Sequence, residues 1–173
     1  MALFNDYANL NGIEKILNYI ASYIIQNETI CKCLKYDSPD CLSKTLTELD
    51  IESLINTNSD NIANRRIYFQ PFINKTIVTK RTELRIYPIN FGVETRVLAK
   101  YYISIEILTH NDLWDLDDSR IRPLAILNEL AISLNGAEVE GIGLLSLEGE
   151  RIPLVAYNDY ISGYRLTFCT GVD

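Results

Sequence analysis

The apolar residues of this chain repeat with two different periods, and the period changes along the sequence. Residues 11–27 and 121–134 carry apolar residues at spacings of three and four, which is typical of a helix with one buried face. Residues 65–108 and the segment after residue 138 largely alternate with a period of two, which is typical of strands. This order predicts an α+β domain with a mostly antiparallel sheet and two principal helices packed on one face.

Both predicted helices have end signals as well as a stripe. Asn11 is the expected N-cap of the first helix, with Glu14 completing a capping-box pattern. For the second helix, residues 117–119 offer Asp and Ser caps, Pro123 falls in the first turn and Gly136 follows the last turn. The first stripe is Ile13, Ile16, Leu17, Ile20, Tyr23 and Ile24, and the second is Ile121, Leu124, Ala125, Leu127, Leu130, Ala131 and Leu134.

The clearest strand is LAKYYISIEIL, residues 98–108. One face carries Ala99, Tyr101, Ile103, Ile105 and Ile107, and the other carries Lys100, Ser104 and Glu106. This alternation predicts a sheet covered on one face only. Further strands are expected at residues 65–72, 80–89, 139–147, 151–157 and 161–169, with turns at Asn90-Phe91-Gly92 and Glu148-Gly149-Glu150.

Residues 1–173 are expected to form one domain, since 47% hydrophobic and 23% charged residues are ordinary for a globular protein of this length. The difficult part is an irregular excursion at about residues 28–64. It holds Cys31, Cys33 and Cys41, a turn at residues 38–40, a short helix at about 40–49 and a polar loop at 56–61.

Two groups of residues invite a chemical interpretation. His110 with the nearby aspartates could form an acid–base or metal cluster, but the spacing matches no EF-hand loop, and carboxylates before a helix favour its positive end. The Cys31-x-Cys33 spacing is unusual for zinc, and Cys169 is distant. With no phosphate-loop or dinucleotide fingerprint at Gly141-Ile142-Gly143, we expect no catalytic residue, metal or cofactor, and hence no enzyme.

Charge and leader signals limit the partners. The net charge is −7, from 16 basic and 23 acidic residues, which is the wrong sign for a protein that grips DNA without regard to sequence. The first residues lack a secretory signal, so free thiols in a reducing compartment are expected. Apolar runs are too short for a membrane span, which predicts no membrane contact.

Tyrosine is frequent, with 11 residues, and three of them fall close together as Tyr157, Tyr160 and Tyr164. Such residues are common at protein interfaces, because the ring gives apolar area and the hydroxyl a hydrogen bond. An ordinary tyrosine-rich sheet explains them equally well. Trp114, within the acidic loop, is expected to be a contact or anchor residue.

From about Arg81 onward, the chain resembles the tail-terminator and head–tail connector proteins of tailed bacteriophages. The resemblance runs through KYYISIEILTHNDL, WDLDDSRIRPLAILNELAISLNG, VEGIGLLSLEGE and YNDYISGYRLTF, and its closing phrase is Gly163-Tyr164-Arg165-Leu166-Thr167-Phe168. The segment 28–64 is longer than the family pattern.

The resemblance implies a tail-terminator-like fold and a virion structural protein. Six or twelve copies would form a neck ring that joins the portal to other neck or tail proteins, assembled in the host cytoplasm. Genome DNA would pass through the ring without specific binding. The expected subunit contacts are the loop 110–119 and the segment 157–164, with Trp114, Asp115, Asp117, Tyr157, Tyr160 and Tyr164. The alternatives are a small metal-dependent enzyme using His110 and the aspartates, or a host-directed binding module.

Overall fold

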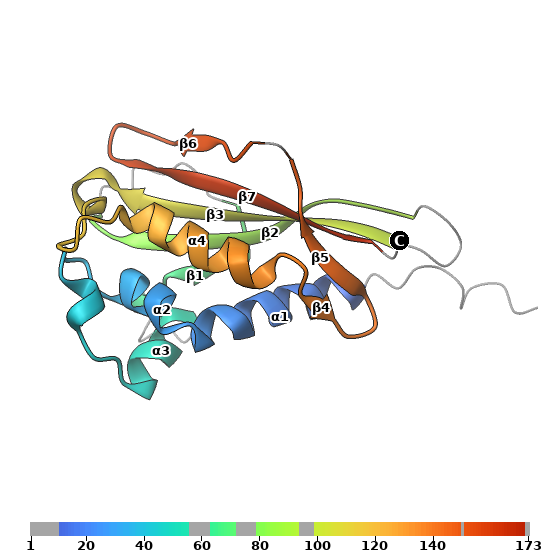
Figure 1. Ribbon diagram of the computed structural model, residues 1–173, viewed down its shortest axis with the longest axis horizontal. Coiled ribbons are helices and arrows are strands. Elements are labelled where there is room, and N and C mark those ends of the chain that lie inside the picture. The colour runs from blue at the N-terminus through green and yellow to red at the C-terminus, as the bar shows by residue number, and fades with distance from the viewer. Residues whose placement is uncertain (1–10, 56–62, 72–78, 94–98, 150, 172–173) are drawn as a thin grey trace, which may run out of the picture.

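The computed structural model describes residues 11–55, 63–71, 79–93, 99–149 and 151–171 (Figure 1). It confirms the predicted α+β class. The helices are α1 (Asn11–Gln26), α2 (Glu28–Lys35), α3 (Glu48–Ile55) and α4 (Arg122–Leu134), with short 3-10 turns η1 (Cys41–Ser43) and η3 (Asn111–Leu113). The strands are β1 (Ile67–Tyr68), β2 (Thr82–Val93), β3 (Ala99–His110), β4 (Glu138–Val139), β5 (Gly143–Leu147), β6 (Leu154–Ala156) and β7 (Ile161–Gly171).

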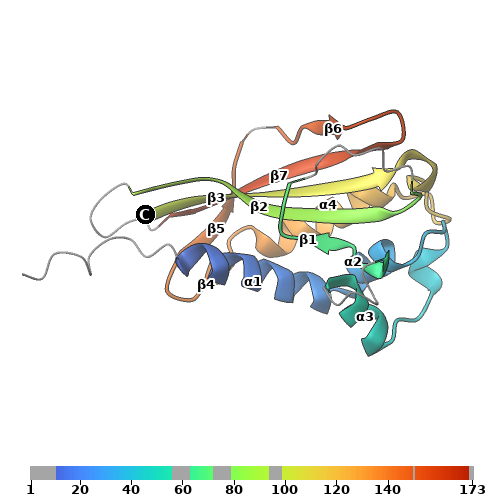
Figure 2. The same ribbon diagram turned by 180° about the vertical axis from the view of Figure 1, so that it is seen from behind.

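The strands form one sheet in the order β1-β2-β3-β7-β5-β4. All pairs are antiparallel except β1 with β2. Strand β7 uses one edge for β3 and shares its other edge between β6 and β5. The helices lie on one side of the sheet, as the two opposite views show (Figures 1 and 2).

The core lies between the sheet and these helices. Ile105 of β3 is flanked in register by Ile86 of β2 and Leu166 of β7, and all three are fully buried. From the helix side, Ile16, Ile20 and Ile24 of α1 and Leu130 of α4 are also fully buried. The periodicities identified the inner faces of α1 and β3, because each buried face follows the local geometry of its element. The predicted face of α4 is only partly right, since Ile121 and Leu124 are exposed and Ile126 is fully buried.

The expected irregular excursion at 28–64 is wrong for most of its described part. It forms α2, η1 and α3, and its buried residues Cys31, Cys33, Leu34, Cys41 and Leu54 belong to the main core. Helix α2 is capped by Asn27, whose side chain accepts from the amide of Ile30 at 3.0 Å. Instead of one helix at 40–49, the chain makes η1 and then α3. The turn at residues 38–40 is confirmed, and the polar loop 56–61 lies outside the described residues.

The turn expected at Asn90-Phe91-Gly92 is wrong as well. Strand β2 continues through it to Val93, and its pairing with β3 shifts between Pro88 and Asn90. An irregularity of this kind absorbs an extra residue without ending the strand. The strand expected at 65–72 is reduced to the two residues of β1.

The ends of the predicted helices are partly corrected. Helix α1 already includes Asn11, so Asn11 is not its N-cap. Helix α4 starts after Ile121, without a side-chain cap, rather than after residues 117–119. Gly136 follows the C-cap Asn135 with a φ of 83°, as its sequence position predicts.

The side of the sheet that faces away from the helices, here called the outer face, is also closed over in its middle. Ser104 and Glu106 are both fully buried, which corrects the expectation of a sheet covered on one face only. Hydrogen bonds from neighbouring side chains make this burial possible for Glu106, as described below.

None of the helices in the described part of the chain has the length and apolar character of a membrane span.

Candidate functional site

The two segments expected to make subunit contacts lie side by side at one end of the sheet. This loop end consists of residues 110–121, which follow β3, and residues 157–161, which precede β7 (Figure 1). Asn111 joins them: its amide donates to the carbonyl of Tyr160 at 2.8 Å, and its side-chain nitrogen donates to the carbonyl of Asp159 at 2.9 Å. Ser162 donates in turn to the side-chain oxygen of Asn111 at 2.5 Å.

His110 is part of the framework of the loop end. Its side chain is almost completely buried, and Nδ1 accepts a hydrogen bond from the amide of Asp112 at 3.2 Å. Its ring stacks on that of Tyr160 with centroids 5.9 Å apart. These contacts hold the 3-10 turn η3 against the turn before β7, so the histidine shapes the surface that the neighbouring residues expose.

The aspartates of this loop point to solvent. Asp115 and Asp117 are both exposed, and the amide of Asp117 donates to the carbonyl of Pro39 at 3.2 Å. Asp118 forms a 2.6 Å ion pair with Arg120, and the hydrogen bond from Arg120 lowers the pKa of that carboxyl. Within the described ranges, no group of three or more His, Cys, Asp or Glu side chains could hold a metal ion.

Trp114 and Tyr164 anchor the loop to the sheet. Their rings are 6.0 Å apart and tilted by 44°, and both side chains are half-buried. Leu113 and Leu116, on either side of Trp114, are buried too. The loop is thus held by apolar anchors while its carboxylates remain outside.

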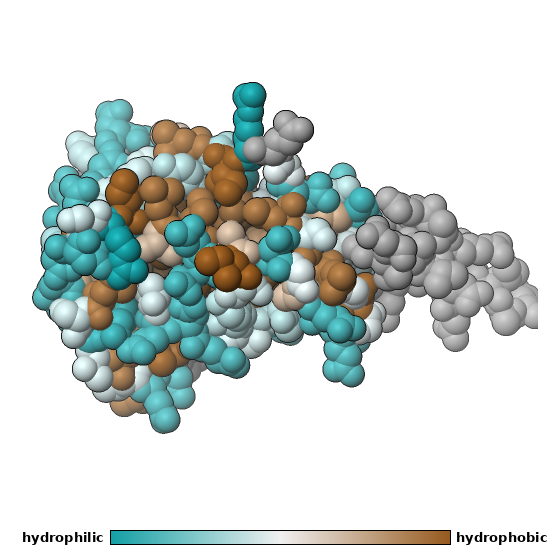
Figure 3. Space-filling model, viewed as in Figure 1, coloured by the Kyte–Doolittle hydropathy of each residue, from teal (hydrophilic) through white to brown (hydrophobic). Residues whose placement is uncertain are grey.

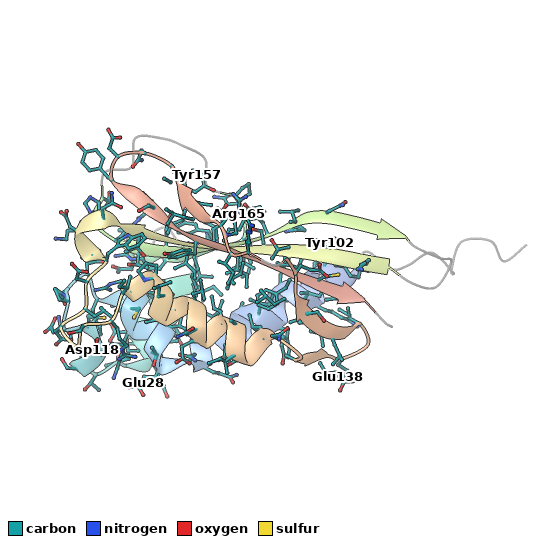
Figure 4. The ribbon with its side chains drawn as sticks, turned by 45° about the horizontal axis from the view of Figure 1, so that its top comes forward. Glu28, Tyr102, Asp118, Glu138, Tyr157 and Arg165 are labelled. Carbon is teal, nitrogen blue, oxygen red and sulfur yellow. The ribbon has the colours of Figure 1, made fainter. Side chains whose placement is uncertain are left out.

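Tyr157 reaches from the loop end to the outer face, where Glu106 collects several donors. Oε1 of Glu106 accepts from the hydroxyl of Tyr157 at 2.5 Å, from that of Tyr87 at 2.9 Å, and from Nε of Arg165 at 2.9 Å. Tyr157 and Arg165 lie next to each other (Figure 4), with Nη2 of Arg165 3.4 Å from the tyrosine hydroxyl. Burial, and next the hydrogen bond to Glu106, raise the pKa of Tyr157 to about 12.

Arg122, the first residue of α4, is the central residue that the sequence did not reveal. It is fully buried, and its guanidinium donates to four carbonyl oxygens: Leu113 at 2.9 Å, Cys33 at 2.7 Å, Tyr36 at 2.7 Å and Ser38 at 2.5 Å. Two of these carbonyls lie at the C-terminal end of α2, where a cation is favoured. Because every partner is backbone, no side-chain pattern marks it in the sequence.

Of the six residues expected at the subunit interface, Asp115, Asp117 and Tyr160 are exposed, and Tyr160 keeps 48% of its surface accessible. Trp114, Tyr157 and Tyr164 are half-buried and fasten the loop end to the sheet. The structure therefore places five of the six in the loop end and Tyr164 on the adjoining part of β7, and their role as subunit contacts stays a prediction.

A second surface with apolar character lies beside the loop end. Brown residues gather over α4 and the strands next to it (Figure 3). Two exposed apolar side chains are Ile132 of α4, which is 79% accessible, and Leu154 of β6, which is 59% accessible. A separate open hollow of about 610 Å³ lies between α1 and the turn after β4, lined by Lys15, Asn18, Tyr19, Ser22, Val139, Glu140 and Gly141.

The sequence comparison assigns the family. A model of the YomW family matches residues 27–170, from the N-cap of α2 nearly to the end of β7. The chain belongs to the YomW family. YomW is a gene name from a Bacillus phage, which points to a phage origin. The match with the YomW family includes the loop end, Arg122 and the three clustered cysteines. Among curated proteins, none matches the sequence.

Proposed function

We propose that this YomW-family protein is a virion structural protein that forms a ring in the head–tail connector of a tailed bacteriophage. In this role it joins the portal to the tail and lines the genome channel, without catalysis or cofactor. The phage gene name of the family and the resemblance of the chain from Arg81 onward to neck proteins both support this assignment.

The observation that carries the proposal is the construction of the loop end. Segments 110–121 and 157–161 are more than thirty residues apart in sequence, yet backbone and side-chain bonds of Asn111 join them into one surface. The enzymatic alternative depends on His110. In the structure this residue supports the loop end, because it accepts from the amide of Asp112 and stacks on Tyr160. A surface built from two segments that hydrogen bonds and ring contacts hold together suits contact with another protein.

The opposite end of the molecule differs in character. Strands β2 and β3 run the length of the sheet and extend past the end of α4 (Figure 2). Strand β1 pairs with β2 at Leu84 and Arg85. Along the rest of its outer edge, β2 has no partner strand among the described residues. Two unlike ends support a heterologous contact between copies, which closes into a ring when the rotation between them allows it.

The charge distribution agrees with passage of DNA. Asp112, Asp115, Asp117 and Asp159 are exposed at the loop end, in a chain whose net charge is −7. A channel lined by negative charge repels the phosphate backbone, so the polymer slides instead of adhering.

The test is made in the phage or prophage that encodes the protein. Purified particles are analysed by quantitative mass spectrometry, and a deletion mutant is examined by electron microscopy. We expect a small fixed number of copies per particle and, in the mutant, heads and tails that fail to join. Complete particles that lack the protein, or normal joining in the deletion mutant, would refute the proposal.

A matched experiment separates this function from the enzymatic alternative. The variant His110→Asn places a carbonyl oxygen where Nδ1 accepts from the amide of Asp112, but removes the imidazole. For a connector protein, particle yield should remain within about threefold of wild type once expression is matched, because the carbonyl oxygen can accept the same bond. A complete loss of phage production with normal, joined particles would favour the enzyme.

A further inference from the structure

Two of the four cysteines lie against each other inside the helical layer. Cys33 is on α2 and Cys41 is the first residue of η1, and a hydrogen bond joins their sulfurs at 3.9 Å. Both side chains are fully buried. A disulfide needs the two sulfurs at about 2 Å, so a rotation of the side chains must close the remaining gap.

Arg122 sets both the position and the electrostatics of this pair. Its guanidinium donates to the carbonyls of Cys33, Tyr36 and Ser38, so it grips the chain on both sides of the segment that connects the two cysteines. The contact with the Cys33 sulfur, and then the charge of Arg122, hold the pKa of Cys41 below its usual range. The pKa of Cys33 is raised by the same contact and by burial. The charge of Arg122 lowers the pKa of both thiols and so favours a single thiolate in the pair.

The other two cysteines serve as internal controls. The thiol of Cys31 donates to the carbonyl of Ile24 at 3.3 Å, and burial raises its pKa to about 12. Cys169 lies on β7, and burial raises its pKa as well. Neither has the nearby thiol that a reversible reaction requires.

Access to the pair is through η1. This element is a single three-residue turn, and Pro39, Asp40 and Ser43 around Cys41 are exposed. Lys44 holds the turn closed from the surface, with an ion pair to Asp40 at 3.2 Å and a bond to the hydroxyl of Ser38 at 2.7 Å. Surface contacts of this kind open locally at low cost, and such an opening exposes Cys41 before Cys33.

We propose that Cys33 and Cys41 form a reversible dithiol–disulfide site that reacts with low-molecular-weight disulfides. The Cys41 thiolate attacks one sulfur of the small disulfide, which releases the first small thiolate and leaves a mixed disulfide on Cys41. The Cys33 thiol loses its proton and attacks the Cys41 sulfur, which releases the second small thiolate. Two electrons pass from the protein to the small disulfide, and the two protons end on the two released thiols.

The new bond would tie α2 to η1 at the base of the loop end. Pro39, two residues before Cys41, accepts from the amide of Asp117, so the staple would limit opening of the segment that supports the acidic loop. The site depends only on the chemistry of the isolated chain, and its test is independent of the connector proposal.

The experiment uses the full chain, first reduced and then incubated with oxidised glutathione near neutral pH. Free thiols are alkylated in denaturant, and the product is analysed by intact mass and peptide mapping. We expect two alkyl groups on the protein instead of the four of the reduced control, a cross-linked peptide pair containing Cys33 and Cys41, and full reversal by dithiothreitol. All four thiols remaining free, or a cross-link through Cys31 or Cys169, would overturn the proposal.

Single substitutions identify the attacking sulfur. The variant Cys33→Ser should accumulate glutathione on Cys41, because the second step has no nucleophile. The matched control Cys169→Ser should form the same internal disulfide as wild type. Accumulation on Cys33 in Cys41→Ser but not on Cys41 in Cys33→Ser would reject Cys41 as the first nucleophile. If a variant does not fold, as judged by circular dichroism, peptide mapping of the wild-type protein still decides whether the site exists.

Discussion

Arg122 shows how one side chain can hold segments that are distant in sequence. Its guanidinium bonds carbonyls of α2, of the turn after α2 and of η3, while its own amide donates to the carbonyl of Trp114 at 2.7 Å. A buried cation is costly unless its donors are satisfied, and here carbonyl dipoles take the place of a carboxylate. The residue therefore organises the base of the loop end.

Replacing Arg122 by Met tests this role. The variant leaves buried carbonyl oxygens without donors, so we expect the free energy of unfolding to fall by about 4 kcal/mol, measured by urea denaturation. The matched control is Arg120→Met. Arg120 is exposed and forms an ion pair with Asp118, so its loss should cost less than about 1 kcal/mol. Equal losses in the two variants would contradict the assigned role.

Tyr157 makes a prediction about alkaline pH. Its pKa is about 12 in the folded protein, against about 10 for an unfolded chain. The stabilisation is fully present below pH 10 and is lost as the pH rises towards 12, because the unfolded state releases its proton first.

The measurement compares urea midpoints between pH 9 and pH 11. Tyr157→Phe should show a shallower fall across this range than wild type, and it should be weaker at pH 9 by about 1 kcal/mol through the lost bond to Glu106. Tyr160→Phe, at an exposed tyrosine of the same turn, should change the stability at pH 9 by less than about 0.5 kcal/mol. An unchanged slope in Tyr157→Phe would place the alkaline transition elsewhere.

Among the elements, β7 approaches β3 closely at Gly163. A Cβ at this position would overlap the carbonyl oxygen of Ile107, so only glycine permits the observed pairing. This gives a structural reason for the glycine that opens the closing phrase of the sequence, and it is a requirement of strand packing rather than of chemistry.

The variant Gly163→Ala should therefore lose about 3 kcal/mol or more of unfolding free energy, since the two central strands must separate locally. Gly136→Ala is the matched control. Its φ of 83° is strained for alanine, but nothing lies within 4 Å of the added carbon, so a loss of about 1 kcal/mol is expected. Thermal unfolding followed by circular dichroism compares the stabilities of the two variants. A smaller loss of stability at Gly163 than at Gly136 would contradict the close contact between Gly163 and the carbonyl of Ile107.

Helices α2 and α3 were not predicted with these bounds, and they differ in how clearly the sequence indicates them. Helix α3 begins with a reciprocal capping box, in which the amide of Asp50 donates to the hydroxyl of Thr47 at 3.2 Å and the amide of Thr47 to the carboxylate of Asp50 at 3.1 Å. The Thr-x-x-Asp pattern was available in the sequence. Helix α2 has only eight residues, too few for a stripe to be distinguished from an irregular segment.

At the scale of the whole molecule, the two unlike ends make assembly directional. We expect the double variant Asp115→Lys with Asp117→Lys to lose assembly on its ring or portal partner, because both carboxylates are exposed at the loop end. Its unfolding free energy should stay within about 1 kcal/mol of wild type. Sedimentation of the mixed components measures assembly.

The control carries the same change in charge elsewhere. Glu52 of α3 and Glu140 after β4 are exposed away from the loop end, and Glu52→Lys with Glu140→Lys should assemble as wild type does. Assembly that tolerates the loop-end changes and fails in the control would move the contact to another surface.

The sequence by itself determined the α+β class, the inner faces of α1 and β3, and the position of Gly136, because periodicity and helix ends depend on neighbouring residues. Only the tertiary structure decided that Arg122 binds carbonyls from three other segments, that Glu106 is buried under Tyr87, Tyr157 and Arg165, and that Cys33 meets Cys41. Those contacts depend on how α2, the sheet and the loop end pack together, and a local pattern does not record which backbone groups that packing leaves in need of partners.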